Sequence, residues 1–336
     1  MLFSVGYKVQ NDERFVEEII KRKDSISEVY LSWGTFPSGR NDQTEIQGLT
    51  PWQAQEKQIN DVKRLARENV KLNLLFNANC YGNKAQSRQL FNLVGTTINY
   101  LLDYNLNSVT TTSPLIAKFI KQNFSGIDGR ASVNMEIATT IGMEYLSDLF
   151  DSYYVAREQN RHLDNLKIIR DWCDKNGKQM YLLANSGCLN NCSAHTFHDN
   201  LVAHEKEIAA MDNGYSFKSA CSTFLQKEQN RNRLLELTNF IRPEDVHLYE
   251  GLVPALKLAT RVHENPVRIL NAYIDKKSFS GNVLGLLEPN HSATLYPYLL
   301  ENKRIKVEYV NEKLIYNDCE NAFVKLEDCY VDKQND

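Results

Sequence analysis

Four side chains that can bind a transition metal follow one another within eleven residues of the sequence. Cys188, Cys192, His195 and His198 form the pattern C-x-x-x-C-x-x-H-x-x-H. Thiolates and imidazoles bind zinc, and thiolates hold iron–sulfur clusters. On a helix, two histidines three residues apart share one face, so we take His195 and His198 as candidate catalytic residues. The competing interpretation is two ordinary buried cysteines followed by the polar first turn of a helix.

The elements that would position this pattern come from the apolar runs of the chain. Residues 180–184 have the length and composition of a buried parallel strand, and Asn185-Ser186-Gly187 is a turn signal. Similar strands are predicted at 3–7, 29–33, 72–76, 108–112, 130–134, 152–156 and 254–259, with helices between them, including a long one at 137–150. This alternation predicts an α/β fold, a (β/α)8 TIM-like barrel, in preference to an open doubly wound sheet.

We expect the barrel to cover residues 1–276 and a short C-terminal extension to cover 277–336. In that extension Ile305, Val307 and Tyr309 alternate with charged residues, which predicts a small hairpin or an edge segment.

Such a barrel gathers the carboxyl ends of its strands at one mouth, where TIM-barrel enzymes carry their active sites. Cys80 follows the third predicted strand, and Cys221 lies in the connection between the seventh and the eighth. Cys80, Cys188, Cys192 and Cys221 could therefore converge on one metal site, either a [4Fe-4S] cluster or a tetrahedral zinc ion. Zinc is the less supported alternative, because the chain has a single close cysteine pair, with three residues between its members.

Polar side chains at strand ends are candidate substrate-binding residues: Asn134, Arg157, Glu158, Asn185 and Arg261. An arginine at such a place suits a carboxylate or a phosphate, which it can bind through two parallel hydrogen bonds. The alternatives are an internal salt bridge of an arginine with Glu158, and asparagines that only cap turns. We expect Cys173 to belong to the core and Cys319 and Cys329 to be structural.

Composition limits the class of protein. The net charge of −3 provides no general basic field for nucleic acid. No apolar run reaches the roughly 18 residues of a membrane span, and the N-terminus lacks the features of a signal peptide. We therefore expect a cytoplasmic protein with no membrane span and reduced thiols. The hydrolase motifs G-x-S-x-G and H-E-x-x-H do not occur.

Roughly residues 2–290 resemble the peptidase U32 family and its barrel-only relatives. The matching segments are Asn79-Cys80-Tyr81-Gly82, Val109-Thr110-Thr111-Thr112-Ser113-Pro114, Ala131-Ser132-Val133-Asn134, Gly187-Cys188-Leu189-Asn190-Asn191-Cys192 with the trailing His195 and His198-Asp199-Asn200-Leu201, Ile241-Arg242-Pro243-Glu244-Asp245, Lys257-Leu258-Ala259-Thr260-Arg261, and the Gly281-Asn282 that precedes Leu286-Leu287. The resemblance implies a TIM-like barrel with a [4Fe-4S] cluster on Cys188, Cys192, Cys221 and Cys80, where His195 could replace one thiolate.

The resemblance also implies a function. Members of the family include oxygen-independent hydroxylases, so we expect modification of a small-molecule or RNA-borne substrate. The alternatives are a collagenase-like U32 metallopeptidase, or another hydrolase, and a non-catalytic cluster-bearing subunit that partners a second U32-like protein.

Overall fold

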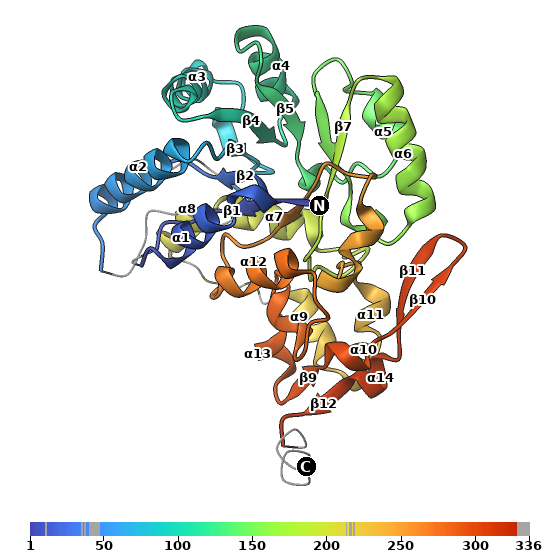
Figure 1. The fold of residues 1–336 in the computed structure, drawn as a ribbon. Coiled ribbons are helices and arrows are strands. Elements are labelled where there is room, and N and C mark those ends of the chain that lie inside the picture. Colours follow the sequence, from blue (N-terminus) through green and yellow to red (C-terminus); the bar gives the residue numbers. More distant parts are fainter. Residues whose placement is uncertain are drawn as a thin grey trace.

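The computed structural model of the chain describes residues 1–10, 12–34, 36, 38, 39, 48–212, 214, 217 and 219–327, without the side chain of Lys206. In this part of the chain eight parallel strands form a closed barrel in sequential order (Figure 1). They are β1 (Leu2–Gly6), β2 (Ile26–Leu31), β3 (Leu72–Phe76), β4 (Leu106–Thr111), β5 (Asp128–Ala131), β6 (Ser152–Tyr154), β7 (Gln179–Leu183) and β8 (Ala255–Leu258). Because β1 pairs with both β2 and β8, the sheet has no free edge. The predicted (β/α)8 TIM-like barrel is confirmed.

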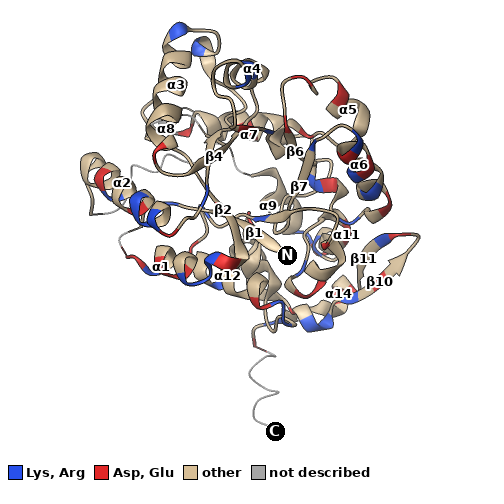
Figure 2. Ribbon diagram, turned by 45° about the horizontal axis from the view of Figure 1, so that its top comes forward, with Lys and Arg blue, Asp and Glu red and all other residues tan. Residues whose placement is uncertain are grey.

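Helices surround the barrel, and several of them carry charged side chains (Figure 2). The outer helices are α1 (Arg14–Lys21), α2 (Pro51–Arg67), α3 (Arg88–Leu102), α4 (Pro114–Asn123), α5 (Thr140–Glu144), α6 (Leu163–Lys175) and α12 (Pro266–Asp275). Local sequence fixes where they begin: Thr50 and Gln53 form a capping box at the start of α2, with Pro51 at the first helical position. None of the described helices is both long and apolar enough to cross a membrane.

Several predicted elements have other boundaries in the structure, and two of these differences have a local cause. The helix predicted at 137–150 is reduced to the short α5. Thr139 is its N-cap, since its hydroxyl accepts a hydrogen bond from the Gly142 amide, and Thr140 and Gly142 are weak helix formers. The strand predicted at 130–134 ends earlier, at Ala131. There the Ser132 hydroxyl accepts a hydrogen bond from the Asn134 amide and turns the chain into a 3₁₀ helix.

The longest connection of the barrel lies between β7 and β8. It contains α7 (His195–Ala203), α8 (Glu205–Ala209), α9 (Ala220–Leu225), α10 (Glu228–Arg231) and α11 (Leu234–Leu237). The 3₁₀ helices of the chain are η1 (Lys23–Ser25), η2 (Gly82–Lys84), η3 (Val133–Met135), η4 (Arg157–Gln159), η5 (Pro243–Tyr249), η6 (Val283–Leu286) and η7 (Asn302–Arg304).

The C-terminal residues pack on this connection (Figure 1). Their elements are α13 (Ser292–Leu295), β9 (Tyr298–Leu300), β10 (Lys306–Val310), β11 (Lys313–Asn317), α14 (Cys319–Ala322) and β12 (Phe323–Lys325). β10 and β11 pair antiparallel, which confirms the predicted hairpin. A second hydrophobic cluster, separate from the barrel core, joins Leu225, Leu234 and Phe240 to Leu284, Leu300 and Leu314.

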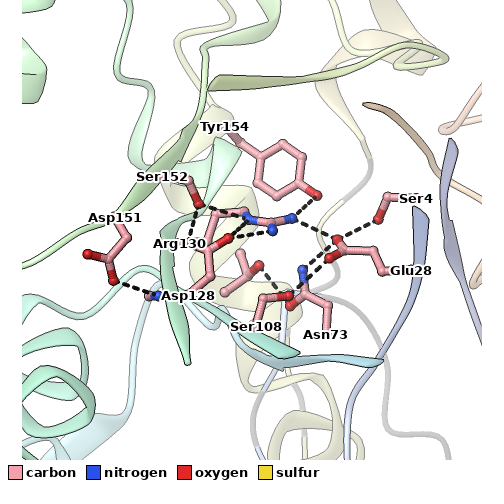
Figure 3. A network of polar contacts seen from close by, with 11 residues as sticks. Ser4, Glu28, Asn73, Ser108, Asp128, Arg130, Asp151, Ser152 and Tyr154 are labelled. Carbon is pink, nitrogen blue, oxygen red and sulfur yellow. Dashed lines mark hydrogen bonds and ion pairs between the residues drawn. The ribbon is translucent and has the colours of Figure 1, made fainter. Parts of the chain in front are cut away.

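The barrel interior holds a buried charged network where such barrels usually hold branched apolar side chains (Figure 3). Its centre is Glu28 of β2 and Arg130 of β5, whose side chains form a 2.7 Å ion pair. Glu28 also accepts hydrogen bonds from Ser4 (2.8 Å), Asn73 (2.9 Å) and Ser108 (3.0 Å). Arg130 also donates to Asp128 (2.6 Å), Ser152 (3.1 Å) and Tyr154 (3.3 Å).

The charges of Glu28 and Arg130 compensate each other. Burial raises the pKa of Glu28, but Arg130 and the neutral donors outweigh burial, so the pKa lies below its ordinary value. Burial likewise lowers the pKa of Arg130, and Glu28 reverses that effect. Both groups therefore remain charged inside the barrel.

Candidate functional site

A cavity opens at the carboxyl ends of the barrel strands, above the charged network. Its wall includes three cationic side chains, Arg157, Lys257 and Arg261, each of which is less than a tenth exposed. Asn77 and Asn134 add side-chain amides to the wall, together with Tyr30 from β2. The three cations outnumber the two carboxylates of the wall, Asp199 and Glu288, which favours a ligand with a negatively charged group.

Lys257 lies within β8 and projects into this cavity, 6 % exposed. Its Nζ lies 4.1 Å from the ring centre of Tyr30 and 4.6 Å from that of Tyr154. Burial, with Arg261 as the next contribution, lowers the pKa of Lys257 to about 7. A substantial fraction of this amine is therefore neutral near physiological pH.

Arg157 connects the cavity to the cysteine-rich segment. Its guanidinium donates to Asn134 Oδ1 (2.9 Å) and to His195 Nε2 (2.8 Å). Among the described residues, its Nε has no hydrogen-bond partner. Because a guanidinium only donates, His195 Nε2 must accept, and the ring proton lies on Nδ1, which faces the Glu136 carboxylate. Asp199, one helical turn on, lies 3.5 Å from His195 Nε2.

A second pocket lies beside the cavity, and Arg157 and Asp199 belong to both walls. It is lined by Cys188 and Cys192 from the β7–α7 loop, by Cys221 from α9, and by both histidines of α7. All three cysteines are free and partly exposed. The structure thus brings Cys188, Cys192, Cys221, His195 and His198 together, as the sequence predicts, and both histidines lie on one helix face.

Cys80 does not line this pocket. Its thiol is hydrogen bonded to the His204 imidazole and accepts from the Gly82 amide at 3.3 Å. His204 in turn contacts Glu207 Oε2 through Nδ1 at 2.9 Å. The hydrogen bond with His204 lowers the pKa of Cys80, and the same contact, with Glu207, raises the pKa of His204.

The donor set fits an iron–sulfur cluster in part. Three thiols face one pocket, are not engaged in disulfides and can be reached from solvent, as cluster ligands require. The fourth predicted ligand, Cys80, lies outside that pocket. Among the described residues, no three or more Cys, His, Asp or Glu side chains are gathered closely enough to enclose a metal ion. The four-cysteine site therefore stays a prediction.

The remaining predicted residues have distinct surroundings. Asn185 is fully buried and bonded to backbone: its Oδ1 accepts from Ala259 N (2.6 Å) and its Nδ2 donates to Leu286 O (2.7 Å). This geometry favours the turn-capping interpretation of Asn185 over substrate binding. Glu158 lines the cysteine pocket, and no ion pair of the described chain joins it to Arg157, which bonds Asn134 and His195 instead.

The cysteines away from the mouth also have defined places. Cys173 is buried in the barrel core, as expected, and Cys319 is buried in the second hydrophobic cluster. Cys329 lies outside the described residues.

Four residues of the site were not among the site residues predicted from the sequence: Lys257, Asp199, His204 and Glu207. Lys257 carried a visible signal, since it interrupts the apolar strand Ala255-Leu256-Lys257-Leu258. The other three lie in α7, in α8 and between the two helices, with no regular spacing to Cys80 or Arg157, so only the fold reveals their proximity.

Comparisons with known proteins agree with this architecture. No model of a known protein family matches the chain. The chain is 26% identical over 263 residues to the "Uncharacterized protease MJ1657" of Methanocaldococcus jannaschii, which covers 75% of this chain and 74% of that protein. Among solved structures it is similar to that of the U32 peptidase Mk0906, with a TM-score of 0.54, 11% sequence identity and coverage of 76% of this chain and 91% of that one. The resemblance of the chain to the peptidase U32 family is thereby confirmed.

Proposed function

We propose that this chain is a U32-like barrel enzyme that carries a [4Fe-4S] cluster and modifies a small-molecule or RNA-borne substrate by oxygen-independent hydroxylation. The observation that carries the proposal is the pocket lined by Cys188, Cys192 and Cys221, which shares a wall with the cationic cavity. A redox group in the one would be next to a substrate in the other.

Under this proposal Cys188, Cys192 and Cys221 supply three ligands, and either Cys80 or His195 supplies the fourth. When bound, such a cluster provides electron transfer. The protein's own groups bind the substrate: Arg157 and Arg261 hold its anionic part. An anion that engages Arg157 would compete for the guanidinium hydrogen bond to His195 Nε2 and so free that nitrogen to accept a proton.

The test is the metal content of protein prepared without oxygen. We expect iron and acid-labile sulfide at about four per chain, the composition of one [4Fe-4S] cluster, with a broad absorbance from thiolate-to-iron charge transfer. Cys188→Ala, Cys192→Ala and Cys221→Ala should each lower the iron content. Cys173→Ala, the same change at a core cysteine, should leave it unaltered.

The variants Cys80→Ala and His195→Gln decide the fourth ligand, since only the true ligand changes the iron content or the spectrum. Colourless protein with stoichiometric zinc would overturn the cluster. If the wild type contains iron and all three cysteine variants contain as much, the ligand assignment is wrong.

A second candidate function is peptide hydrolysis, and one arrangement favours it. Cys80, His204 and Glu207 form a hydrogen-bonded thiol–imidazole–carboxylate chain, the set that activates a cysteine nucleophile. The relative from Methanocaldococcus jannaschii also bears the name protease.

This candidate predicts cleavage of a fluorogenic peptide library by metal-free protein. Cleavage should be lost in Cys80→Ala and in His204→Gln. It should be retained in Cys188→Ala, which leaves the hydrogen bonds among Cys80, His204 and Glu207 unchanged. Absence of cleavage in the wild type, or its persistence in Cys80→Ala, would exclude this role for the Cys80 chain.

A further inference from the structure

Lys257 is the buried group of the barrel mouth for which neither candidate function has a use. It lies in the middle of β8 with 6 % exposure, and its Nζ lies against the faces of Tyr30 and Tyr154. Lysine is rarely buried to this extent unless a carboxylate pairs with it.

Within the described chain, no carboxylate pairs with Lys257. The buried carboxylate that raises its pKa is Glu28, and that group is already bonded to Arg130, Ser4, Asn73 and Ser108. Three cations lower the pKa of Lys257 further, Arg261 after β8, Arg130 of β5 and Arg157 after β6, and the carboxylates of Asp199 and Glu288 also line the cavity. The mouth therefore disfavours an ammonium at this position and favours a neutral amine.

A neutral amine in a cavity is a nucleophile for carbonyl carbon. We propose that Lys257 forms an imine with a carbonyl compound that also carries a carboxylate or a phosphate, which Arg157 and Arg261 bind. The unpartnered Nε of Arg157 belongs to the wall of the same cavity.

The step balances without an oxidant or a reductant. The Lys257 nitrogen forms a bond to the carbonyl carbon, and the carbonyl oxygen leaves as water with the two protons of the amine. The imine then takes one proton from solvent. Lowering of the Lys257 pKa to about 7 makes the attacking form abundant near neutral pH.

The test uses glyoxylate, a small aldehyde with a carboxylate, together with sodium cyanoborohydride at pH 7 on the full chain. Reduction of the iminium traps a secondary amine whose added mass is that of glyoxylate less one oxygen atom. Peptide mapping should find the adduct on Lys257 at a rate at least about tenfold above that of Lys175, an exposed lysine at the end of α6.

Two comparisons separate the parts of the proposal. Formaldehyde, a carbonyl compound without an anionic group, should prefer Lys257 over Lys175 by a smaller factor than glyoxylate does, because only the neutral state of the amine favours its reaction. Arg261→Gln should slow labelling of Lys257 by glyoxylate about tenfold more than labelling by formaldehyde, because it removes an anion-binding group as well as a cation that lowers the pKa of Lys257. Equal slowing of both reagents would overturn the anion-binding role of Arg261.

Lys257→Met, which places an apolar chain among the same aromatic rings, should remove the selective adduct while Lys175 still labels. Wild-type protein that labels Lys175 but not Lys257 would overturn the imine. The inference does not rest on the cluster, because the adduct is read at Lys257 whether or not the preparation contains iron.

Discussion

Buried charged side chains have different partners at two levels of the barrel interior. At the lower level, Glu28 and Arg130 are paired with each other and surrounded by hydrogen-bonding side chains. At the mouth, Lys257 has two aromatic faces and cationic neighbours but no carboxylate partner in the described chain.

The difference separates charge that serves the fold from charge that serves a ligand. In a buried ion pair each charge is compensated by its partner and by hydrogen bonds, so removal of one ion leaves the other uncompensated. An unpaired cation at a cavity has no such partner to lose. Substitutions at the two levels should therefore have opposite effects on stability.

The largest effect is expected for Glu28→Ala. Loss of this carboxylate leaves Arg130 buried beside a weaker set of partners and should lower the free energy of unfolding by about 3–5 kcal/mol. Urea unfolding measures it. The double variant Glu28→Ala/Arg130→Met should recover part of the loss, and a double variant as unstable as the sum of the single changes would contradict the pairing.

Lys257→Met should act in the opposite direction and depend on pH. The folded-state pKa of Lys257 is about 7, below the unfolded value of about 10.4, so between them only the unfolded chain holds the proton. Wild-type stability should therefore rise with pH across this window, by about 3 kcal/mol from pH 7 to 9.5 from this group alone.

The variant lacks this contribution, so its advantage over the wild type should shrink by that amount over the same interval. Urea unfolding of both proteins at the two pH values measures the difference, in which the titration of other groups cancels. A difference independent of pH would mean that Lys257 is charged in the folded protein.

Asn185→Ala tests whether this buried side chain serves the fold through its hydrogen bonds to the backbone. The variant leaves the buried Ala259 N–H and Leu286 carbonyl without their partner and should destabilise by about 2 kcal/mol. Thermal unfolding at neutral pH reports it. Unchanged stability would return Asn185 to the list of substrate-binding candidates.

Ser152→Ala should have the smallest effect, about 1 kcal/mol, measured by urea unfolding. Its hydroxyl bridges Asp128 and Arg130, but these two ions keep a direct hydrogen bond of 2.6 Å. A loss as large as that of Glu28→Ala would show that the neutral members of the network, and not the ion pairs, carry its stability.

Much of the fold could be predicted from the sequence, because most barrel strands are short runs rich in apolar or β-branched residues, followed by a turn or a helix start. The eight strands fall where the runs predict them, and the errors concern ends, as at Ala131, where a serine side chain competes for the backbone. Side-chain competition of this kind depends on geometry that periodicity does not contain.

The site was predictable only where its residues are close in sequence or follow a strand directly. Cys188, Cys192, His195 and His198 share one loop and one helix face, and the structure keeps them in one pocket. The partner of Cys80 could not be predicted, since His204 lies at the end of α7, 124 positions along the chain, and its position depends on how that helix crosses the mouth.

The second hydrophobic cluster has a consequence for how the site is assembled. The segment with Cys221 contributes Leu225 to a core whose other half comes from residues 283–322. On the ribosome, the barrel strands emerge before that half does, so α9 gains its final packing only at the end of synthesis. The loop with the first two thiols contacts the same half, through Leu189 on the cluster and through Gly187 N, which donates to Glu288 O. All three thiols of the pocket therefore gain their final surroundings only at the end of synthesis.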